Sequence, residues 1–205
     1  MLRGQLRWAI DHDFPERVEL LARHDVDLRS PFPADGRTPV EVALRSGRRA
    51  LVEMLVAYGA PRPDPKPVDA FVGAALAADR AELDRLAAAD PGLEARACRE
   101  RPGLVVWAAA DGRAEAIRLL VERGFDVNAL GRGDTPVEGR WETALHQAAQ
   151  HGNVELALLL LELGADPDRR DARFDSTPLG WSRHFDQPAV AAILTPLTTP
   201  EPPAG

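Results

Sequence analysis

Histidine is the residue type in this sequence best suited to metal binding or acid–base catalysis, and the chain contains five histidines. His146 and His151 are five positions apart (151 − 146), a spacing that turns them about 140° from each other on a helix, so they cannot share one zinc ion. His151 and His184 lie at nearly equivalent places in two neighbouring helical segments, but a third ligand is missing. The histidines therefore predict neither a metal site nor a bound cofactor.

Other residues that could carry chemistry stand alone in the sequence. Cys98 is the single cysteine, and no histidine lies near it that could orient or activate its thiol. Gly131, Gly133 and Gly139 do not follow a strand and open a helix, as a phosphate-binding loop must. Residues 132–134 spell the integrin-type tripeptide Arg-Gly-Asp, which we attribute to chance. We predict that the chain has no catalytic residues and is not an enzyme.

Residues 143–164 instead indicate a pair of helices. Thr143 can cap a first helix, whose apolar residues recur at helical spacing until Gly152. A second helix follows and ends at Gly164, and its apolar residues fall mostly at three- and four-residue steps: Val154, Leu156, Leu159, Leu160 and Leu163. Two helices this short are marginal in water, so we expect the pair to stack on copies of itself.

Similar helix pairs recur along the chain. The residue that separates the two helices of each pair falls at positions 13, 47, 79, 112, 152 and 186. The best copy resembles the ankyrin repeat family, whose signature is Thr-Pro-Leu-His-x-Ala. The residues that carry the resemblance are Thr143, Leu145, His146, Ala148, Ala149 and Gly152, with Ala144 where proline is usual. Glu41, Gly73, Val106 and Gly180 replace the histidine elsewhere, so the family's Thr-His hydrogen bonding is expected only in the fifth repeat.

The resemblance implies an all-α fold, an ankyrin-repeat solenoid of about six stacked helix-turn-helix units with short β-hairpin fingers before the helix pairs. We expect a single solenoid over residues 1–194, with units at about 1–29, 30–60, 67–92, 100–128, 138–168 and 171–194. Residues 61–67 have proline at every second position, which predicts an extended inter-repeat loop. The spacing from 112 to 152 is 40 residues and predicts an extended finger at 129–140. The proline-rich tail, 195–205, is expected to be disordered.

Composition narrows the range of partners. With 45% hydrophobic and 28% charged residues, the 205-residue chain is typical of a globular protein. Its net charge of −7 lacks the basic character that phosphate binding requires, so we do not expect nucleic acid as a partner. The sequence contains neither a signal peptide nor about 18 consecutive apolar residues, which favours a cytoplasmic monomer without membrane contact.

What remains is recognition of another protein. In the ankyrin family, partners contact the finger tips and the exposed side of the first, inner helix of each pair, which together form a concave face. This resemblance implies the following partner-binding residues: Arg37, Arg45, Trp107, Asp111, Arg140, Trp141, Gln150, His151, Phe174, Trp181 and His184. Trp8, Trp107 and Trp181 align at one repeat position, which borders both core and interface, and their sequence leaves these two roles open.

The predicted function is therefore a non-catalytic protein–protein interaction module, with a role as regulator or inhibitor of its partner. The alternative is an enzyme or small-ligand-binding protein built on an ankyrin-like fold. An enzyme would need a closed pocket with converging titratable groups, whereas a binding module would present an open groove.

Overall fold

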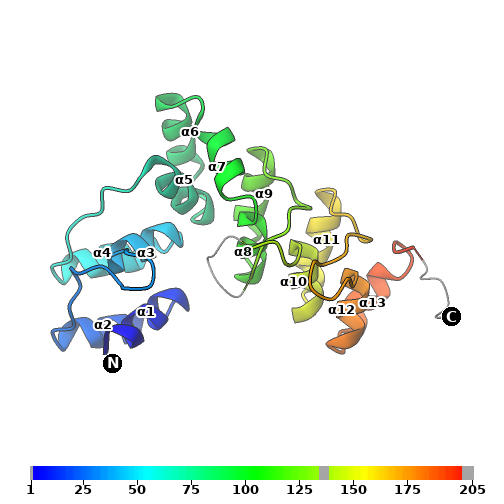
Figure 1. Ribbon diagram of the computed structural model, residues 1–205, viewed down its shortest axis with the longest axis horizontal. Helices are drawn as coiled ribbons and strands as arrows, with labels where there is room; N and C mark the ends of the chain where they lie inside the picture. The colour runs from blue at the N-terminus through cyan, green and yellow to red at the C-terminus, as the bar shows by residue number, and fades with distance from the viewer. Residues whose placement is uncertain (1, 134–138, 200–205) are drawn as a thin grey trace. The chain divides into compact units, whose positions relative to one another are not determined.

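The computed structural model describes residues 2–133 and 139–199 (Figure 1). Thirteen helices lie within these residues, and the only β-structure found there is one isolated antiparallel bridge, Gly131 to Glu142. The helices confirm the all-α class. The chain divides into two compact units, residues 1–93 and 94–205, and each is described by itself.

Unit 1 consists of three successive helix pairs. Their bounds are α1 Leu2–Asp11 and α2 Pro15–Arg23, α3 Pro39–Arg45 and α4 Arg49–Ala57, then α5 Pro67–Leu76 and α6 Arg80–Ala89. The first helices of neighbouring pairs pack on each other, α1 on α3 and α3 on α5, and α2 packs on α4. Fully buried side chains fill the space between them, among them Leu6, Ile10, Leu51, Leu55, Phe71 and Leu83.

A helix that the repeat pattern did not include, α7 Leu93–Glu100, lies at the boundary of the two units. Its first residue, Leu93, belongs to unit 1, and the rest of the helix belongs to unit 2. Three helix pairs follow: α8 Leu104–Ala110 and α9 Ala114–Glu122, α10 Ala144–His151 and α11 Val154–Glu162, then α12 Pro178–His184 and α13 Pro188–Leu194. The first helices α8, α10 and α12 are neighbours, with α10 in the middle. Ile117, Leu120, Leu145, Leu160 and Leu194 are fully buried in this unit.

Local hydrogen bonds fix the starts of α10 and α3. The Thr143 backbone N–H donates to His146 Nδ1 at 3.2 Å, and Thr143 Oγ1 lies 2.8 Å from the same nitrogen. This bears out the predicted Thr-His bonding of the fifth repeat. In the first full repeat, Glu41 replaces the histidine and also caps the helix start. The Thr38 backbone N–H donates to Glu41 Oε2 at 2.8 Å, and the Glu41 backbone N–H donates to Thr38 Oγ1.

A close helix contact explains another replacement of the signature histidine. Gly73 lies in α5, and a β-carbon at this position would overlap the backbone carbonyl of Leu44 in α3. Because that neighbour is backbone, it cannot rotate away. A histidine at position 73 would therefore force α3 and α5 apart.

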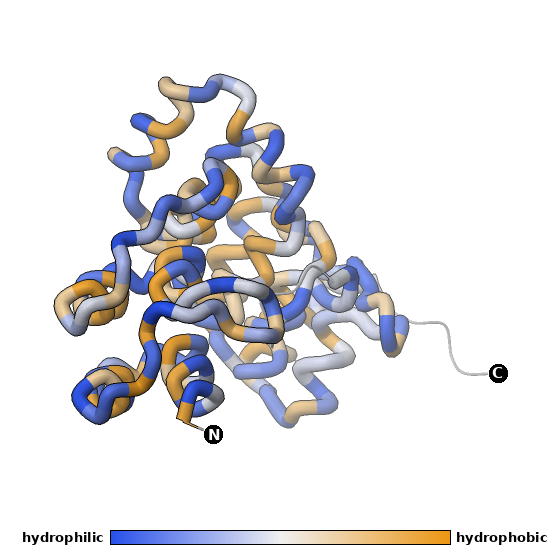
Figure 2. Tube along the Cα trace, turned by 60° about the vertical axis from the view of Figure 1, so that its left-hand side comes forward, coloured by the Kyte–Doolittle hydropathy of each residue, from blue (hydrophilic) through white to orange (hydrophobic). Residues whose placement is uncertain are grey.

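Turns and loops separate the helices. Figure 2 shows hydrophilic residues (blue) at most turns and apolar stretches (orange) along the helices. Residues 60–66 have no regular secondary structure, and α5 starts at Pro67. Thr199 donates from its backbone N–H to Asp168 Oδ1 at 2.8 Å, which attaches residues 195–199 to the loop before α12.

Three sequence-based predictions fall partly outside the described residues. These are the extended finger (134–138), the aspartate of the Arg-Gly-Asp tripeptide (134) and the disordered tail (200–205). In the part of the chain that the structure describes, no helix is long and apolar enough to cross a membrane.

Candidate functional site

The histidines do not converge on a metal or catalytic site. No group of three or more histidine, cysteine or carboxylate side chains with the geometry to bind a metal ion occurs among residues 2–133 and 139–199. His151 Nδ1 lies 2.9 Å from the Gln147 carbonyl oxygen, to which it donates within α10. The His184 ring packs edge-on against Phe185, with ring centroids 4.9 Å apart.

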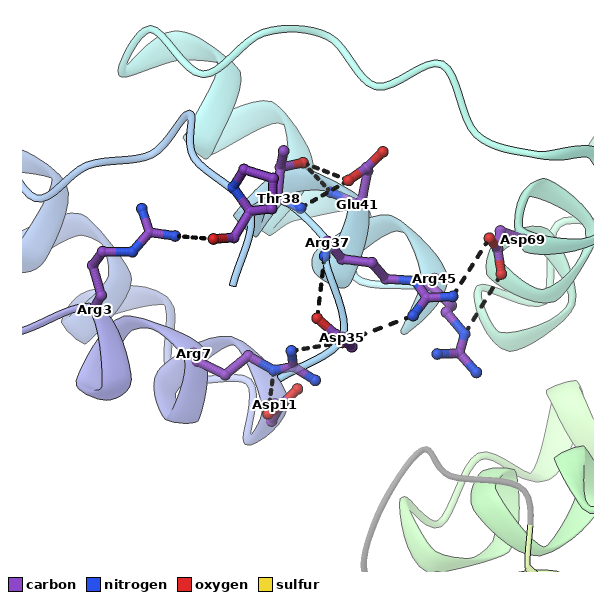
Figure 3. A network of polar contacts seen from close by, with 10 residues as sticks. Arg3, Arg7, Asp11, Asp35, Arg37, Thr38, Glu41, Arg45 and Asp69 are labelled. Atoms are coloured by element: carbon purple, nitrogen blue, oxygen red, sulfur yellow. Dashed lines mark hydrogen bonds and ion pairs between the residues drawn. The ribbon is translucent and has the colours of Figure 1, made fainter. Parts of the chain in front are cut away.

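Unit 1 carries a chain of alternating charges along its inner helices (Figure 3). Arg7 in α1 contacts Asp11 at 2.7 Å and Asp35 in the following finger at 2.8 Å. Arg37 lies between Asp35 and Asp69 of α5, with 3.8 Å to each carboxylate, and Arg45 of α3 lies 3.6 Å from Asp69. Arg37 and Arg45 therefore already engage carboxylates of their own unit.

A shallow pocket of about 230 Å³ adjoins this charge chain. Its lining combines carboxylates with the cations Arg37 and Lys66: Asp35, Gly36, Arg37, Glu41, Leu44, Asp64, Pro65, Lys66 and Asp69. Asp35, Arg37 and Asp69 of this lining already form ion pairs within unit 1, which reduces the charge that they present to a ligand.

Unit 2 contains a larger, open pocket of about 320 Å³ whose lining includes four aromatic rings. It lies where two successive fingers meet the inner helices α10 and α12, and its lining residues are Ala110, Gly133, Trp141, Glu142, Gln147, Gln150, His151, Phe174, Trp181 and Phe185. We call this the aromatic pocket. Phe174 is 62% exposed and Phe185 is 40% exposed, so two of its four rings face solvent.

Asp171 holds the second of these fingers in place. Its buried carboxylate accepts hydrogen bonds from the backbone N–H groups of Arg173, Phe174 and Ser176 at 2.8, 2.6 and 3.0 Å. The Trp181 indole N–H donates to the same carboxylate at 3.0 Å. Burial alone would raise the pKa of Asp171, but the hydrogen bonds from Phe174, Trp181 and the other donors outweigh it and lower the pKa below its usual value. The charged carboxylate therefore positions Phe174 and Trp181 relative to each other.

Hydrogen bonds also join the two fingers and the helices. The Ala172 N–H donates to the Trp141 carbonyl at 2.7 Å, which connects the fingers before α10 and α12. His146 Nε2 lies 3.0 Å from the Ser176 carbonyl, so the proton is on Nε2 while Nδ1 accepts from Thr143. Burial lowers the pKa of His146, which keeps this neutral form.

The base of the aromatic pocket holds a buried carboxylate. Glu142 Oε1 accepts from Gln147 Nε2 at 2.7 Å and from the Gly133 N–H at 2.9 Å. A β-carbon at position 133 would lie 2.5 Å from the Gln147 side-chain amide carbon. Gly133, the middle residue of the Arg-Gly-Asp tripeptide, thus has a packing role at the wall of the pocket.

Two guanidinium groups lie over Trp141 at the rim. The Arg132 and Arg173 Cζ atoms are 4.8 and 4.5 Å from the Trp141 ring centroid, and Arg173 is also 5.0 Å from the Phe174 ring centroid. These distances are those of cation–π contacts. Arg132 and Arg173, together with Asp171, were not among the residues predicted from sequence.

Five of the predicted binding residues line the aromatic pocket, and the others lie elsewhere. Those in the pocket are Trp141, Gln150, His151, Phe174 and Trp181. His184 packs beside Phe185, and Arg140 is exposed outside the lining. Trp107 is half-buried in α8, Asp111 is exposed and pairs with Arg113 at 2.7 Å, and Arg37 and Arg45 belong to unit 1.

The three aligned tryptophans have different environments. Trp181 is 7% exposed, with its indole N–H bound to Asp171, while Trp8 is exposed and stacks on His12 and Phe14. Asp171 was not predicted as a site residue, because aspartates that accept from a backbone N–H two positions on recur in other loops of the chain, as at Asp126 and Asp166. The run from Asp171 to Ser176 does have the form of an aspartate that caps the backbone of its own turn, a signal that could have indicated it.

The helix pairs with capped starts and short intervening fingers define a helical-repeat protein. Residues 74–171 match the family model described as ankyrin repeats (3 copies), so this part of the chain consists of ankyrin repeats. Ankyrin repeats generally mediate protein–protein interaction.

Parts of the chain are similar to segments of much longer curated proteins. A stretch of 94 residues, 44% of this chain, is 39% identical to E3 ubiquitin-protein ligase Ufd4 of Drosophila melanogaster and spans 3% of that protein. A stretch of 69 residues, 34% of this chain, is 39% identical to palmitoyltransferase Hip14 of Drosophila melanogaster and spans 10% of that protein. Over 58 residues, 28% of the chain, it is 48% identical to an ankyrin repeat and LEM domain-containing protein 1 homolog of Caenorhabditis elegans, 7% of which is covered.

Proposed function

We propose that this chain is a non-catalytic module that binds a partner protein through the fingers and inner helices of unit 2, centred on the aromatic pocket. The observation that carries the proposal is the exposure of Phe174 and Phe185 at the opening of that pocket. Exposed aromatic side chains grouped at one place are typical of binding surfaces, because water contact with them is unfavourable until a partner covers them.

The titratable side chains in the described lining of the aromatic pocket, Glu142 and His151, are each hydrogen-bonded within unit 2, which supports binding rather than catalysis. The described lining of the aromatic pocket has one buried carboxylate, Glu142, which is already engaged by Gln147 and Gly133. Ufd4 and Hip14 are named for two different reactions, yet the segments they share with this chain make up 3% and 10% of their lengths. A segment common to different enzymes is better suited to recognition than to either reaction.

Affinity capture with matched variants tests the proposal. The immobilised chain is incubated with lysate of its source organism, and retained proteins are quantified by mass spectrometry for the wild type, for the double variant Phe174→Ala/Phe185→Ala, and for Leu158→Ala. Leu158 is exposed on α11 and serves as the control for losing an exposed apolar side chain. A partner retained by the wild type and Leu158→Ala but lost by the double variant is the expected result. If the double variant retains every protein that the wild type retains, this surface is not the binding site.

A further inference from the structure

The proposed binding site has a chemical preference that can be inferred from its lining. We propose that the aromatic pocket receives an arginine side chain from a basic segment of the partner. This inference rests on the proposed function and specifies the partner that the same site would recognise.

The charge of the pocket favours a cation. Among its described lining residues, Glu142 alone carries a formal charge at neutral pH, and that carboxylate is buried at the base of the pocket. No lysine or arginine contributes to this described lining; the positively charged Arg132 and Arg173 lie at its rim, with their guanidinium groups over the Trp141 ring. The net charge of −7 on the whole chain also favours the approach of a basic partner over an acidic one.

The aromatic rings favour a flat cation. The Trp181 ring centroid lies 6.5 Å from that of Phe174 and 5.9 Å from that of Phe185, so the buried Trp181 ring lies beside both exposed phenylalanine rings. Guanidinium groups bind ring faces both by charge and by planar stacking. Unit 2 already contains this interaction, since Arg132 and Arg173 lie over Trp141 at the pocket rim.

Two polar side chains of the lining, Gln147 and His151, offer hydrogen-bond acceptors. Gln147 donates its amide N–H to Glu142, which leaves the amide oxygen as an acceptor. His151 donates from Nδ1 to the Gln147 carbonyl, which leaves Nε2 as an acceptor when the ring is neutral. A guanidinium has five N–H donors and no acceptor, so it complements these groups better than a carboxylate or a carbonyl does.

The size of the pocket fits one side chain of a larger partner. Pockets for small molecules measure about 300–1,000 Å³, and this open pocket of about 320 Å³ lies at the lower end of that range. An open pocket of that size can bury one long side chain while the rest of the partner lies along the fingers.

Short peptides test the inference on the wild-type chain. Three acetylated and amidated pentapeptides carry arginine, citrulline or norleucine between pairs of alanines, and a fourth carries trimethyl-lysine. Each is titrated into ¹⁵N-labelled protein while the indole N–H resonances of the four tryptophans are followed by NMR. We expect saturable shifts of Trp141 and Trp181 with arginine, and at least fivefold weaker binding of the other three peptides.

Citrulline is the decisive comparison, because it keeps the shape of arginine and loses the charge. Equal binding of citrulline or norleucine, tighter binding of trimethyl-lysine, or no saturable shift with arginine at millimolar concentration would each overturn the inference.

Two variants locate the binding within the pocket. Phe185→Leu removes a ring and keeps an apolar side chain, and Glu142→Gln removes the charge and keeps an acceptor oxygen. Each should weaken arginine-peptide binding at least threefold, while Phe14→Leu, which alters an exposed ring of unit 1, should not. Unchanged binding by Phe185→Leu would also contradict the inference, and this test holds even if Glu142→Gln perturbs the finger.

The inference and the proposed function can fail separately. If capture of the partner depends on Phe174 and Phe185 but arginine peptides do not bind, the site is correct and its preference is wrong. If arginine peptides bind but the double variant still captures the partner, the proposed binding surface is wrong.

Discussion

At the scale of single residues, unit 2 depends on two buried polar side chains that act on the backbone. Asp171 orders the finger before α12, and His146 connects the start of α10 to that same finger. Buried polar groups of this kind are costly when one partner is removed, because the remaining donors lose their hydrogen bonds without regaining water. The consequences can be measured for each residue.

Asp171→Ala should lower the free energy of unfolding by about 2–4 kcal/mol, because three backbone N–H groups and the Trp181 indole N–H lose their acceptor. Asp175→Asn is the control, since the Asp175 side chain in the same finger is exposed and asparagine tolerates its φ of 51°, and it should change stability by less than about 0.5 kcal/mol. Urea unfolding followed by circular dichroism measures both. Equal effects of the two changes would show that Asp171 does not hold the finger.

His146 should make stability decrease under mildly acidic conditions. Burial lowers its pKa in the folded protein from the ordinary value of 6.5, so above that pH the histidine is neutral in both states. As the pH falls below 6.5, the unfolded chain binds a proton that the folded chain does not, and stability is lost until the lower folded pKa is reached.

The contribution of His146 is the difference between the wild type and His146→Gln, which cannot titrate. Unfolding free energies measured between pH 7.5 and 5 should fall more steeply for the wild type. Parallel curves would indicate that His146 has the same pKa in both states.

At the scale of elements, each outer helix is stabilised by one apolar face. In α11, Leu159 is 5% exposed, whereas its neighbour Leu158 is 51% exposed. The helical period accounts for this difference, since adjacent residues point about 100° apart around the axis.

Leu159→Ala should therefore lower the free energy of unfolding by about 2–5 kcal/mol, because the change removes buried apolar atoms from a packed core. Leu158→Ala removes the same atoms from the surface and should cost less than about 0.5 kcal/mol. Chemical denaturation of the two variants tests the register of α11. A loss below half a kilocalorie for Leu159→Ala would place the buried face elsewhere.

At the scale of the whole molecule, the two units present different inner surfaces. In unit 1, Arg7, Arg37 and Arg45 are paired with carboxylates of the same unit, and the exposed Trp8 and Phe14 rings stack on each other. Unit 2 exposes aromatic rings around an open pocket. Paired surface charges contribute little binding energy, while exposed aromatic anchors contribute much. We therefore expect the binding energy to be concentrated in unit 2.

Once a partner has been identified, Arg140→Ala and Phe174→Ala should each weaken its binding by more than about 1 kcal/mol. The melting temperature should stay nearly unchanged, because both side chains are exposed. Charge reversal at Glu155 and Glu162, on the outer helix α11, should leave affinity as it is. Titration calorimetry of the four variants makes the comparison. Loss of binding only in the α11 variants would place the interface on the outer helices.

The sequence by itself determined the elements that depend on short-range interactions. Thr143 precedes α10 and caps it as predicted, Thr38 and Thr177 occupy the same position before α3 and α12, and Gly152 ends α10 in the left-handed conformation. The apolar spacing of residues 154–163 placed α11 correctly. Helix α7 was not predicted, because eight residues without a repeat partner give too weak a periodic signal.

The tertiary structure decided which residues meet. Glu142, Gln147 and Gly133 come together only when the finger folds onto α10. Asp171 in the next finger binds Trp181 in α12, which lies ten positions later in the sequence. Trp8 and Trp181 share one repeat position, yet the first is exposed and the second buried, because Trp181 has an adjacent finger with a carboxylate acceptor. Helix caps and helical periodicity depend on neighbours within about four residues in the sequence. A pocket depends on loops, and contacts with residues far away in the sequence determine the conformation of those loops.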